Sequence, residues 1–299
     1  MPNAVVAQAA RLNPIVELLA QKRPVFGLYA PRSNVDVPKT PAQLAQEALA
    51  YTHADFLFDG TMENAVRFER TLPAFAEFAS AMGQAGVVEN GRLRQPLVVK
   101  MHAIARDPSL AAQHIAQQLN VGVSAVVFVG VESAEEVRHG VSAMRLAAHG
   151  GIRPDDVGTA PALWGMTEQQ YRERADVWPL NPRGELVNWT IVESREGLAR
   201  VREIAAVPGI GVLFPGAGTL RGLFRTTSAD GRQVFDEAAW EAAIQQVLAA
   251  CKEFDVACGY PATESDIEKR MQQGFSVFIM NWGEPGFRAV ELGRKVAGR

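Results

Sequence analysis

The sequence of 299 residues lacks the features that mark several protein classes. It has no window of about 18 consecutive apolar residues, which excludes a membrane-spanning helix and gives no reason to expect a membrane partner. Lysine and arginine form no run and the formal net charge is only −3, so we expect no nucleic-acid binding. Residues 1–19 mix apolar and polar side chains, unlike the apolar centre of a signal peptide. These absences predict a cytoplasmic protein.

Cysteine is scarce, with only Cys251 and Cys258 in the chain. Two thiols cannot supply the four ligands of a structural zinc site. In a cytoplasmic protein such residues stay reduced as a rule. We therefore expect a pair of thiols and no zinc.

Short apolar runs closed by polar residues, glycine or proline dominate the pattern, and such runs are typical of parallel strands buried on both faces. Eight of them occur, at residues 25–30, 55–59, 97–101, 125–130, 188–193, 211–216, 256–260 and 276–282. Their starts lie about 36 residues apart on average, close to the repeat of a (β/α)8 barrel, and helical patterns fill the intervals. The sequence predicts an α/β fold, a single (β/α)8 TIM barrel domain over residues 1–299.

The longest interval predicts a loop insertion at about residues 150–186. It holds four prolines and the aromatic residues Trp164, Tyr171 and Trp178. Long loops in compact domains often carry function, so we expect these aromatic side chains to shape a binding pocket.

Residues at the ends of the apolar runs are the first candidates for a site, because active sites of such barrels form at the carboxyl ends of the strands. Glu193 closes a run buried on both faces, where an ionised carboxylate needs a metal ion, a cation or hydrogen-bond donors. Lys100 either stabilises an oxyanion, forms a Schiff base or makes a salt bridge to a carboxylate at the rim. Asp59 and Glu132 have structural alternatives, a turn cap and a helix N-terminus. His114 is expected on a solvated helix face.

A segment rich in small residues follows the sixth run, with the sequence FPGAGTL. It contains Gly216, Ala217, Gly218 and Thr219. Consecutive backbone N–H groups in such a turn are suited to an anionic group of a ligand.

The order of these pieces resembles the HpcH/HpaI aldolase (citrate lyase β-type) family of divalent-metal (β/α)8 lyases. The likeness rests on residues 23–30, 54–60 and 96–102, and above all on 191–220. There a strand ends in glutamate, and a Val-Pro-Gly turn leads to a strand with a glycine-rich loop. The resemblance implies that Glu193 is a metal-binding carboxylate and that the backbone amides of Gly216, Ala217 and Gly218 hold the carboxylate of an oxo acid.

The chain departs from the family pattern at three polar positions. Thr219 stands where the family has its second metal ligand, an aspartate, and Lys100 stands where it has a catalytic arginine. Met62 stands where it has a histidine, so His102 is the candidate replacement base. A divalent ion (Mg, Mn or Co) is implied by the resemblance, but the loss of a carboxylate weakens or abolishes its binding.

The leading hypothesis is a carbon–carbon lyase of the aldolase type. It would cleave a hydroxy-oxo acid through an enolate stabilised by a metal on Glu193 or by Lys100, with His102 or a metal-bound water as base. The aromatic segment around Trp164 suggests a bulky or aromatic aldehyde half, as in the breakdown of aromatic compounds. Two alternatives remain open, a metal-independent lyase that uses Lys100 as a Schiff base and a catalytically inactive ligand-binding barrel.

The last segment, residues 284–299, has the pattern of the final barrel helix. In the family that helix is commonly exchanged between subunits. The resemblance therefore implies a homo-oligomer.

Overall fold

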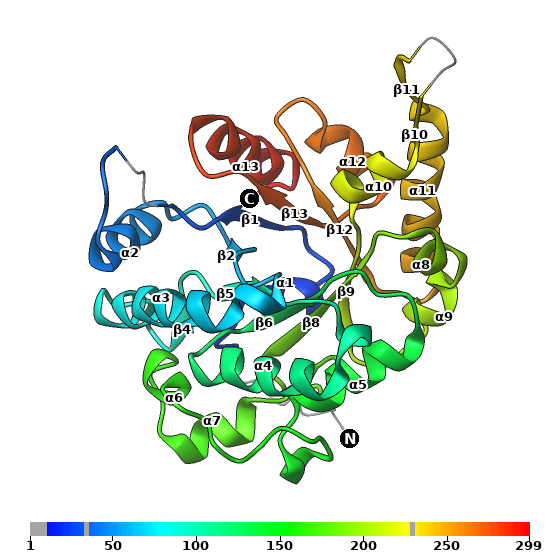
Figure 1. Cartoon of the computed structure of the whole chain (residues 1–299). Coiled ribbons are helices and arrows are strands. Elements are labelled where there is room, and N and C mark those ends of the chain that lie inside the picture. Colours follow the sequence, from blue (N-terminus) through cyan, green and yellow to red (C-terminus); the bar gives the residue numbers. More distant parts are fainter. Residues whose placement is uncertain (1–10, 33–35, 228–230) are drawn as a thin grey trace, which may run out of the picture.

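The computed structural model describes residues 11–32, 36–227 and 231–299. Eight parallel strands form a closed barrel surrounded by helices (Figure 1), as the spacing of the apolar runs predicts. Each strand pairs with the next in chain order and the last pairs with the first. The strands are β1 (Val25–Tyr29), β2 (Phe56–Asp59), β5 (Leu97–Lys100), β6 (Ala125–Phe128), β8 (Leu186–Val192), β9 (Ile210–Pro215), β12 (Ala257–Pro261) and β13 (Val277–Met280).

Helices connect the strands and cover the outside of the barrel (Figure 1). They are α2 (Pro41–Ala50), α3 (Ala65–Gln84), α4 (Pro108–Asn120), α5 (Ala134–Met144), α8 (Arg195–Ala199), α9 (Val201–Ala205), α10 (Ala217–Leu223), α11 (Glu237–Glu253), α12 (Ile267–Gln273) and α13 (Glu284–Val296). Local signals start several of them. Thr40 forms a capping box with Gln43 ahead of α2, and the Ser133 side chain accepts a hydrogen bond from the Glu136 backbone at the start of α5.

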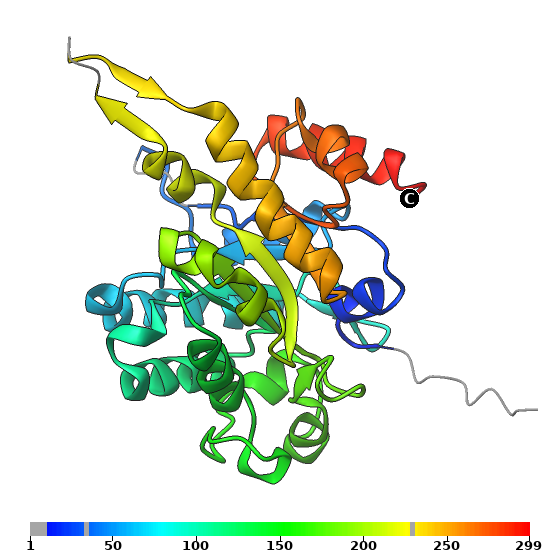
Figure 2. The ribbon, with the colours of Figure 1, turned by 90° about the vertical axis from the view of Figure 1, so that its right-hand side faces the viewer.

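Two short hairpins extend the barrel. Strands β3 (Val88–Glu89) and β4 (Arg92–Leu93) form one near the amino-terminal end of the barrel. Strands β10 (Arg225–Thr227) and β11 (Gln233–Phe235) form the other, which projects away from the barrel between α10 and α11 (Figure 2).

The barrel interior is packed with aromatic side chains. Trp189 contacts the rings of Phe56, Phe58 and Phe214. Helix α1 (Pro14–Ala20) adds apolar residues to the same buried cluster and so closes the amino-terminal end. Only the carboxyl ends of the strands are left to hold a site inside the barrel.

The segment 150–186 is more structured than a loop. It contains α6 (Ala160–Leu163), α7 (Glu168–Arg174) and β7 (Val177–Trp178), and β7 pairs with β8. Because the segment leads from α5 into the start of β8, it lies at the amino-terminal end of the barrel.

The two cysteines differ from the expected thiol pair, because the structure joins Cys251 and Cys258 in a disulfide. Cys251 lies in the last turns of α11 and Cys258 in β12. The chain reverses between them, with Asp255 in a left-handed conformation (φ 52°), and brings their Cα atoms to 5.7 Å. The expected pair of free thiols is therefore wrong, because the tight reversal of the chain between α11 and β12 brings the two sulfur atoms together.

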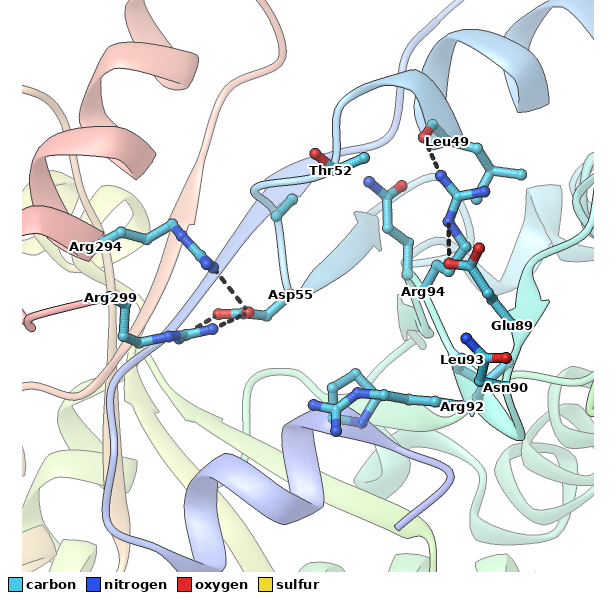
Figure 3. Close-up of a pocket in the computed structure, with 13 residues that line it drawn as sticks. Leu49, Thr52, Asp55, Glu89, Asn90, Arg92, Leu93, Arg94, Arg294 and Arg299 are labelled. Atoms are coloured by element: carbon cyan, nitrogen blue, oxygen red, sulfur yellow. Dashed lines mark hydrogen bonds and ion pairs between the residues drawn. The ribbon is translucent and has the colours of Figure 1, made fainter. Parts of the chain in front are cut away.

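Helix α13 packs against β1 and β13 of its own barrel. Arg294 in α13 and Arg299 just after it both bind the carboxylate of Asp55 (Figure 3). Exchange of this helix between subunits stays a prediction. Among the described residues, no helix is both long enough and apolar enough to cross a membrane.

Candidate active site

A cavity of about 200 Å³ lies at the carboxyl ends of the barrel strands. It brings together Lys100, Glu193 and the segment from Gly216 to Thr219, which the sequence placed at one rim. The remaining lining residues are Tyr29, Phe58, Ile191, Phe214, Pro261 and Ile279. Sequence reasoning did not single out these residues, although alternation along each strand is the signal that finds them.

Strand alternation also explains why two charged side chains face the cavity. Val98 and Ile191 belong to the buried cluster inside the barrel. Lys100 and Glu193 each follow two residues later and therefore point to the same side. The side chains of Lys100 and Glu193 therefore lie just beyond the apolar side chains that fill the barrel interior.

The carboxylate of Glu193 is held in place by the backbone around it. Its Oε1 atom accepts a hydrogen bond of 2.9 Å from the N–H of Gly130, two residues after the neighbouring strand β6 ends. Its Oε2 atom faces Gly216, where a Cβ atom would lie only 2.5 Å away. The group is thus positioned directly beside the glycine-rich segment.

The glycine-rich segment forms the start of α10. The N–H of Gly216 donates to the carbonyl of Val192, and the first bond within the helix runs from the N–H of Leu220 to the carbonyl of Gly216. The intervening N–H groups, those of Ala217, Gly218 and Thr219, have no acceptor within the helix. All three residues line the cavity.

Lys100 combines two of the roles expected for it. Its ammonium group lies 2.9 Å from Oε2 of Glu63, a carboxylate at the rim, and its side chain also lines the cavity. The side chain is 18% exposed. Gln118, which is fully buried, donates to the Lys100 carbonyl and fixes the end of β5.

His102 is not part of the cavity lining, so the expectation that it serves as the base is wrong for this structure. Its Nε2 atom lies 2.9 Å from Nδ1 of His114, which stacks on Phe68 with ring centroids 3.7 Å apart. His114 is buried rather than solvated, and burial lowers its pKa, with the neighbouring His102 adding to the effect. Both histidines are held in the helix layer.

Trp164 also lies away from the cavity, which corrects its assignment to substrate binding. It is fully buried and its indole N–H donates to the carbonyl of Gly122, just before β6 begins. Tyr171 packs against its ring. The aromatic residues of this segment fill the core at the opposite end of the barrel.

Asp59 and Glu132 serve local structure. Asp59 accepts a hydrogen bond from the N–H of Thr61 and so caps a turn. Glu132 precedes α5, and its N–H donates to the side chain of Glu136.

The residues of the cavity do not fit a resident divalent ion. Glu193 is the single carboxylate in the lining, Thr219 is neutral and Lys100 is cationic. Within the described ranges, no group of three His, Cys, Asp or Glu side chains is arranged to hold a metal. Mg²⁺ sites in proteins usually have one or two carboxylates, and here Glu193 would be the single one, in a cavity whose cationic Lys100 opposes a second positive charge.

Comparison with known proteins agrees with this architecture. The family model for HpcH/HpaI aldolase/citrate lyase matches residues 37–287. The chain belongs to this family. It is therefore a lyase of the aldolase and citrate lyase type.

Individual members of the family are distant relatives. The chain is 28% identical over 261 residues to a hydroxypyruvate/pyruvate aldolase of Delftia acidovorans, covering 86% of this chain and 81% of that protein. It shares its fold with an HpcH/HpaI aldolase/citrate lyase family protein from Burkholderia cenocepacia, with a TM-score of 0.64, 22% identity and coverage of 96% and 98%. The citrate lyase β subunit of M. tuberculosis, solved with oxaloacetate and magnesium, has a TM-score of 0.55 at 14% identity, with coverage of 94% and 100%.

Proposed function

We propose that this HpcH/HpaI family lyase cleaves a 4-hydroxy-2-oxo acid into an aldehyde and pyruvate or a related 2-oxo acid. The observation that carries the proposal is the single cavity shared by Lys100, Glu193 and the segment from Gly216 to Thr219. A cation, a carboxylate and free backbone N–H groups are the parts that such a cleavage needs. The name of the Delftia acidovorans relative supports pyruvate as the oxo-acid product.

The substrate carboxylate would rest on the N–H groups of Ala217, Gly218 and Thr219. Lys100 would lie at the 2-oxo oxygen, where negative charge develops when the enolate forms. Lys100 can exchange its contact with Glu63 for a contact with this oxygen, because Glu63 is 44% exposed and water can solvate its carboxylate. A lysine keeps the charge of an arginine but contacts one oxygen instead of two.

Glu193 would act as the base. It takes the proton from the C4 hydroxyl, the C3–C4 bond breaks, and its electron pair forms the enolate of the oxo acid while the aldehyde leaves. The proton held on Glu193 then goes to C3 of the enolate and yields the 2-oxo acid. Atoms and charge balance without any further reactant.

The test is pyruvate release from a panel of 4-hydroxy-2-oxo acids, measured with and without added Mg²⁺, Mn²⁺ or Co²⁺. We expect turnover that falls by at least about 100-fold in Glu193→Gln and in Lys100→Met. The matched control is His53→Asn, an exposed position with a side chain outside the cavity. Absence of release under every condition would reject the proposal and favour the inactive ligand-binding barrel.

A second candidate is a Schiff-base lyase, favoured by the presence of just one lysine in the cavity lining. In this route the Lys100 amine attacks the 2-oxo carbon and water leaves, so that the iminium takes up the electron pair of the broken bond. Borohydride trapping with pyruvate should then add a mass to the peptide that contains Lys100. Cleavage without such an adduct would exclude the Schiff-base route and support the enolate route.

The assembly and the location also remain proposals. Sedimentation of the purified protein will show whether it forms the expected homo-oligomer. A cytoplasmic location would be tested by fractionation of cells that express it.

A further inference from the structure

One hydrogen bond links the glycine-rich segment to a helix outside the cavity. Helix α11 packs against α10 (Figure 1), and the indole N–H of Trp240, near the start of α11, donates to the carbonyl of Ala217 at 2.9 Å. Trp240 itself is outside the cavity lining. Any effect of its indole N–H on the candidate active site therefore passes through the backbone at Ala217.

The contacted carbonyl belongs to a peptide unit whose other side carries a free donor. In a planar trans peptide unit the C=O and N–H bonds point in opposite directions. The carbonyl of Ala217 shares its unit with the N–H of Gly218, one of the N–H groups at the start of α10 that have no acceptor within the helix. Because Trp240 binds the carbonyl, this N–H is directed away from α11, and Gly218 lines the cavity.

Helix α10 needs such support because it is weak by itself. It has seven residues, two of which are Gly218 and Gly222. Short helices are marginally stable on their own, and glycine is a poor helix former. A Cβ atom built on Gly218 would have no atom within 4 Å, so the segment is not packed on that side. The contact from α11 is thus a specific restraint on the first peptide unit of α10.

Trp240 is itself held in place by charged neighbours. The guanidinium groups of Arg221 and Arg270 lie 5.7 and 5.9 Å from the centre of its ring. Arg270 is only 3% exposed and binds both carboxylate oxygens of Glu241, the residue after Trp240. It also donates to the hydroxyl of Tyr260 in β12, at 3.0 Å. These contacts fix the start of α11, and with it the indole, relative to the barrel.

We propose that Trp240 is a positioning residue for the lyase cavity, whose indole N–H holds the peptide unit of Ala217 and Gly218 so that the Gly218 N–H points at the carboxylate of the oxo acid. The inference rests on the proposed function, in which that carboxylate lies on these N–H groups. Hydrogen bonds at both ends of one peptide unit strengthen each other, so Trp240 also makes this N–H a better donor. The carboxylate is bound alike before and during cleavage, so the residue acts on substrate affinity and not on the chemical step.

Steady-state kinetics of Trp240→Phe, which keeps an aromatic ring and loses the N–H donor, test the proposal. We expect KM for the 4-hydroxy-2-oxo acid to rise by about 3- to 10-fold, the worth of one hydrogen bond, with kcat unchanged. The matched control is Trp164→Phe, which takes an indole N–H from the carbonyl of Gly122 at the opposite end of the barrel and should leave KM unchanged. An unchanged KM in folded Trp240→Phe, or a loss confined to kcat, would overturn the proposal.

A binding measurement separates this inference from the proposed reaction. The chain has five tryptophans, and the indole N–H resonance of Trp240 is the one that disappears from the NMR spectrum of Trp240→Phe. Pyruvate should shift this resonance in the wild type and leave that of Trp164 in place. Pyruvate affinity, measured by titration calorimetry, should fall by about 3- to 10-fold in Trp240→Phe. This result supports the role of Trp240 even where no pyruvate is released from any substrate, whereas equal affinity contradicts that role even where release is normal.

A second substitution guards against loss of the fold. The amino acid 3-benzothienylalanine at position 240 keeps the shape of tryptophan, with sulfur in place of the N–H group. It should weaken pyruvate binding as much as Trp240→Phe does. Wild-type affinity in this variant would contradict the role of the N–H donor. Circular dichroism checks that each variant is folded.

Discussion

A methyl group built on Gly216 would lie 2.5 Å from Oε2 of Glu193. The glycine-rich segment can therefore approach the carboxylate only because position 216 has no side chain. Its backbone angles, φ −69° and ψ 66°, put no demand on glycine themselves. The close approach explains the residue type and ties the segment to the carboxylate.

Gly216→Ala should disable the site more than it unfolds the protein. The new methyl group forces Glu193 to move, and a displacement of about 1 Å at a reacting group costs about 100-fold in kcat/KM. We expect a stability loss of about 1–3 kcal/mol, typical of overpacking. Urea denaturation and pyruvate release measure the two effects. Gly222→Ala, in the same helix with no atom within 4 Å of the added Cβ, is the control.

Thr219→Asp should strengthen the binding of a divalent metal ion at this cavity. A second carboxylate beside Glu193 gives a hard divalent ion the charge and oxygen ligands that the cavity does not offer. We expect Mn²⁺ affinity to rise by at least about 10-fold, measured by titration calorimetry at pH 7. Thr226→Asp adds the same charge to the exposed strand β10 and should have no such effect. Equal Mn²⁺ binding by wild type and Thr219→Asp would contradict our description of the donor set.

Much of the barrel could be predicted, because its requirements are local. A strand buried on both faces needs a continuous apolar run, and each of the eight runs became a barrel strand. Parallel strands end at one rim, so Lys100 and Glu193 were placed together correctly. Trp164 was misplaced because its segment follows a helix and precedes a strand, and such a connection lies at the amino-terminal end.

The histidine pair could not be predicted from the sequence. His102 and His114 meet only because the turn after β5 folds back onto α4. Contacts of this kind depend on how a helix packs, which periodicity alone does not specify.

The buried side chain of His114 should make stability depend on pH. Because burial lowers the pKa of His114 in the folded state, the unfolded chain takes up a proton on it first as the pH falls below about 6.5. Folding stability is then lost between pH 6.5 and the lowered pKa. The difference in unfolding free energy between wild type and His114→Asn should therefore shrink as the pH falls from 7.5 to 5.5, measured by urea denaturation. A difference that stays constant would contradict this, and the exposed His53→Asn is the control.

The clamp on Asp55 should be a main anchor of the chain's carboxyl-terminal helix. The Asp55 carboxylate is buried, accepts from the N–H of Phe26 at 2.9 Å and binds both Arg294 and Arg299. Asp55→Ala leaves two partly buried guanidinium groups and a backbone N–H without their acceptor, which costs about 3 kcal/mol or more.

Urea denaturation of Asp55→Ala measures this cost, and hydrogen exchange should show that α13 opens before the rest of the barrel. The matched control is Asp255→Asn, which breaks the exposed ion pair with Lys22 and keeps a residue that tolerates the left-handed backbone at position 255. Exposed pairs contribute about 0–1 kcal/mol, so the control should unfold close to wild type. Equal stability of the two variants would show that Arg294 and Arg299 find other acceptors when Asp55 is lost. In that case α13 would be held mainly by its apolar contacts with β1 and β13.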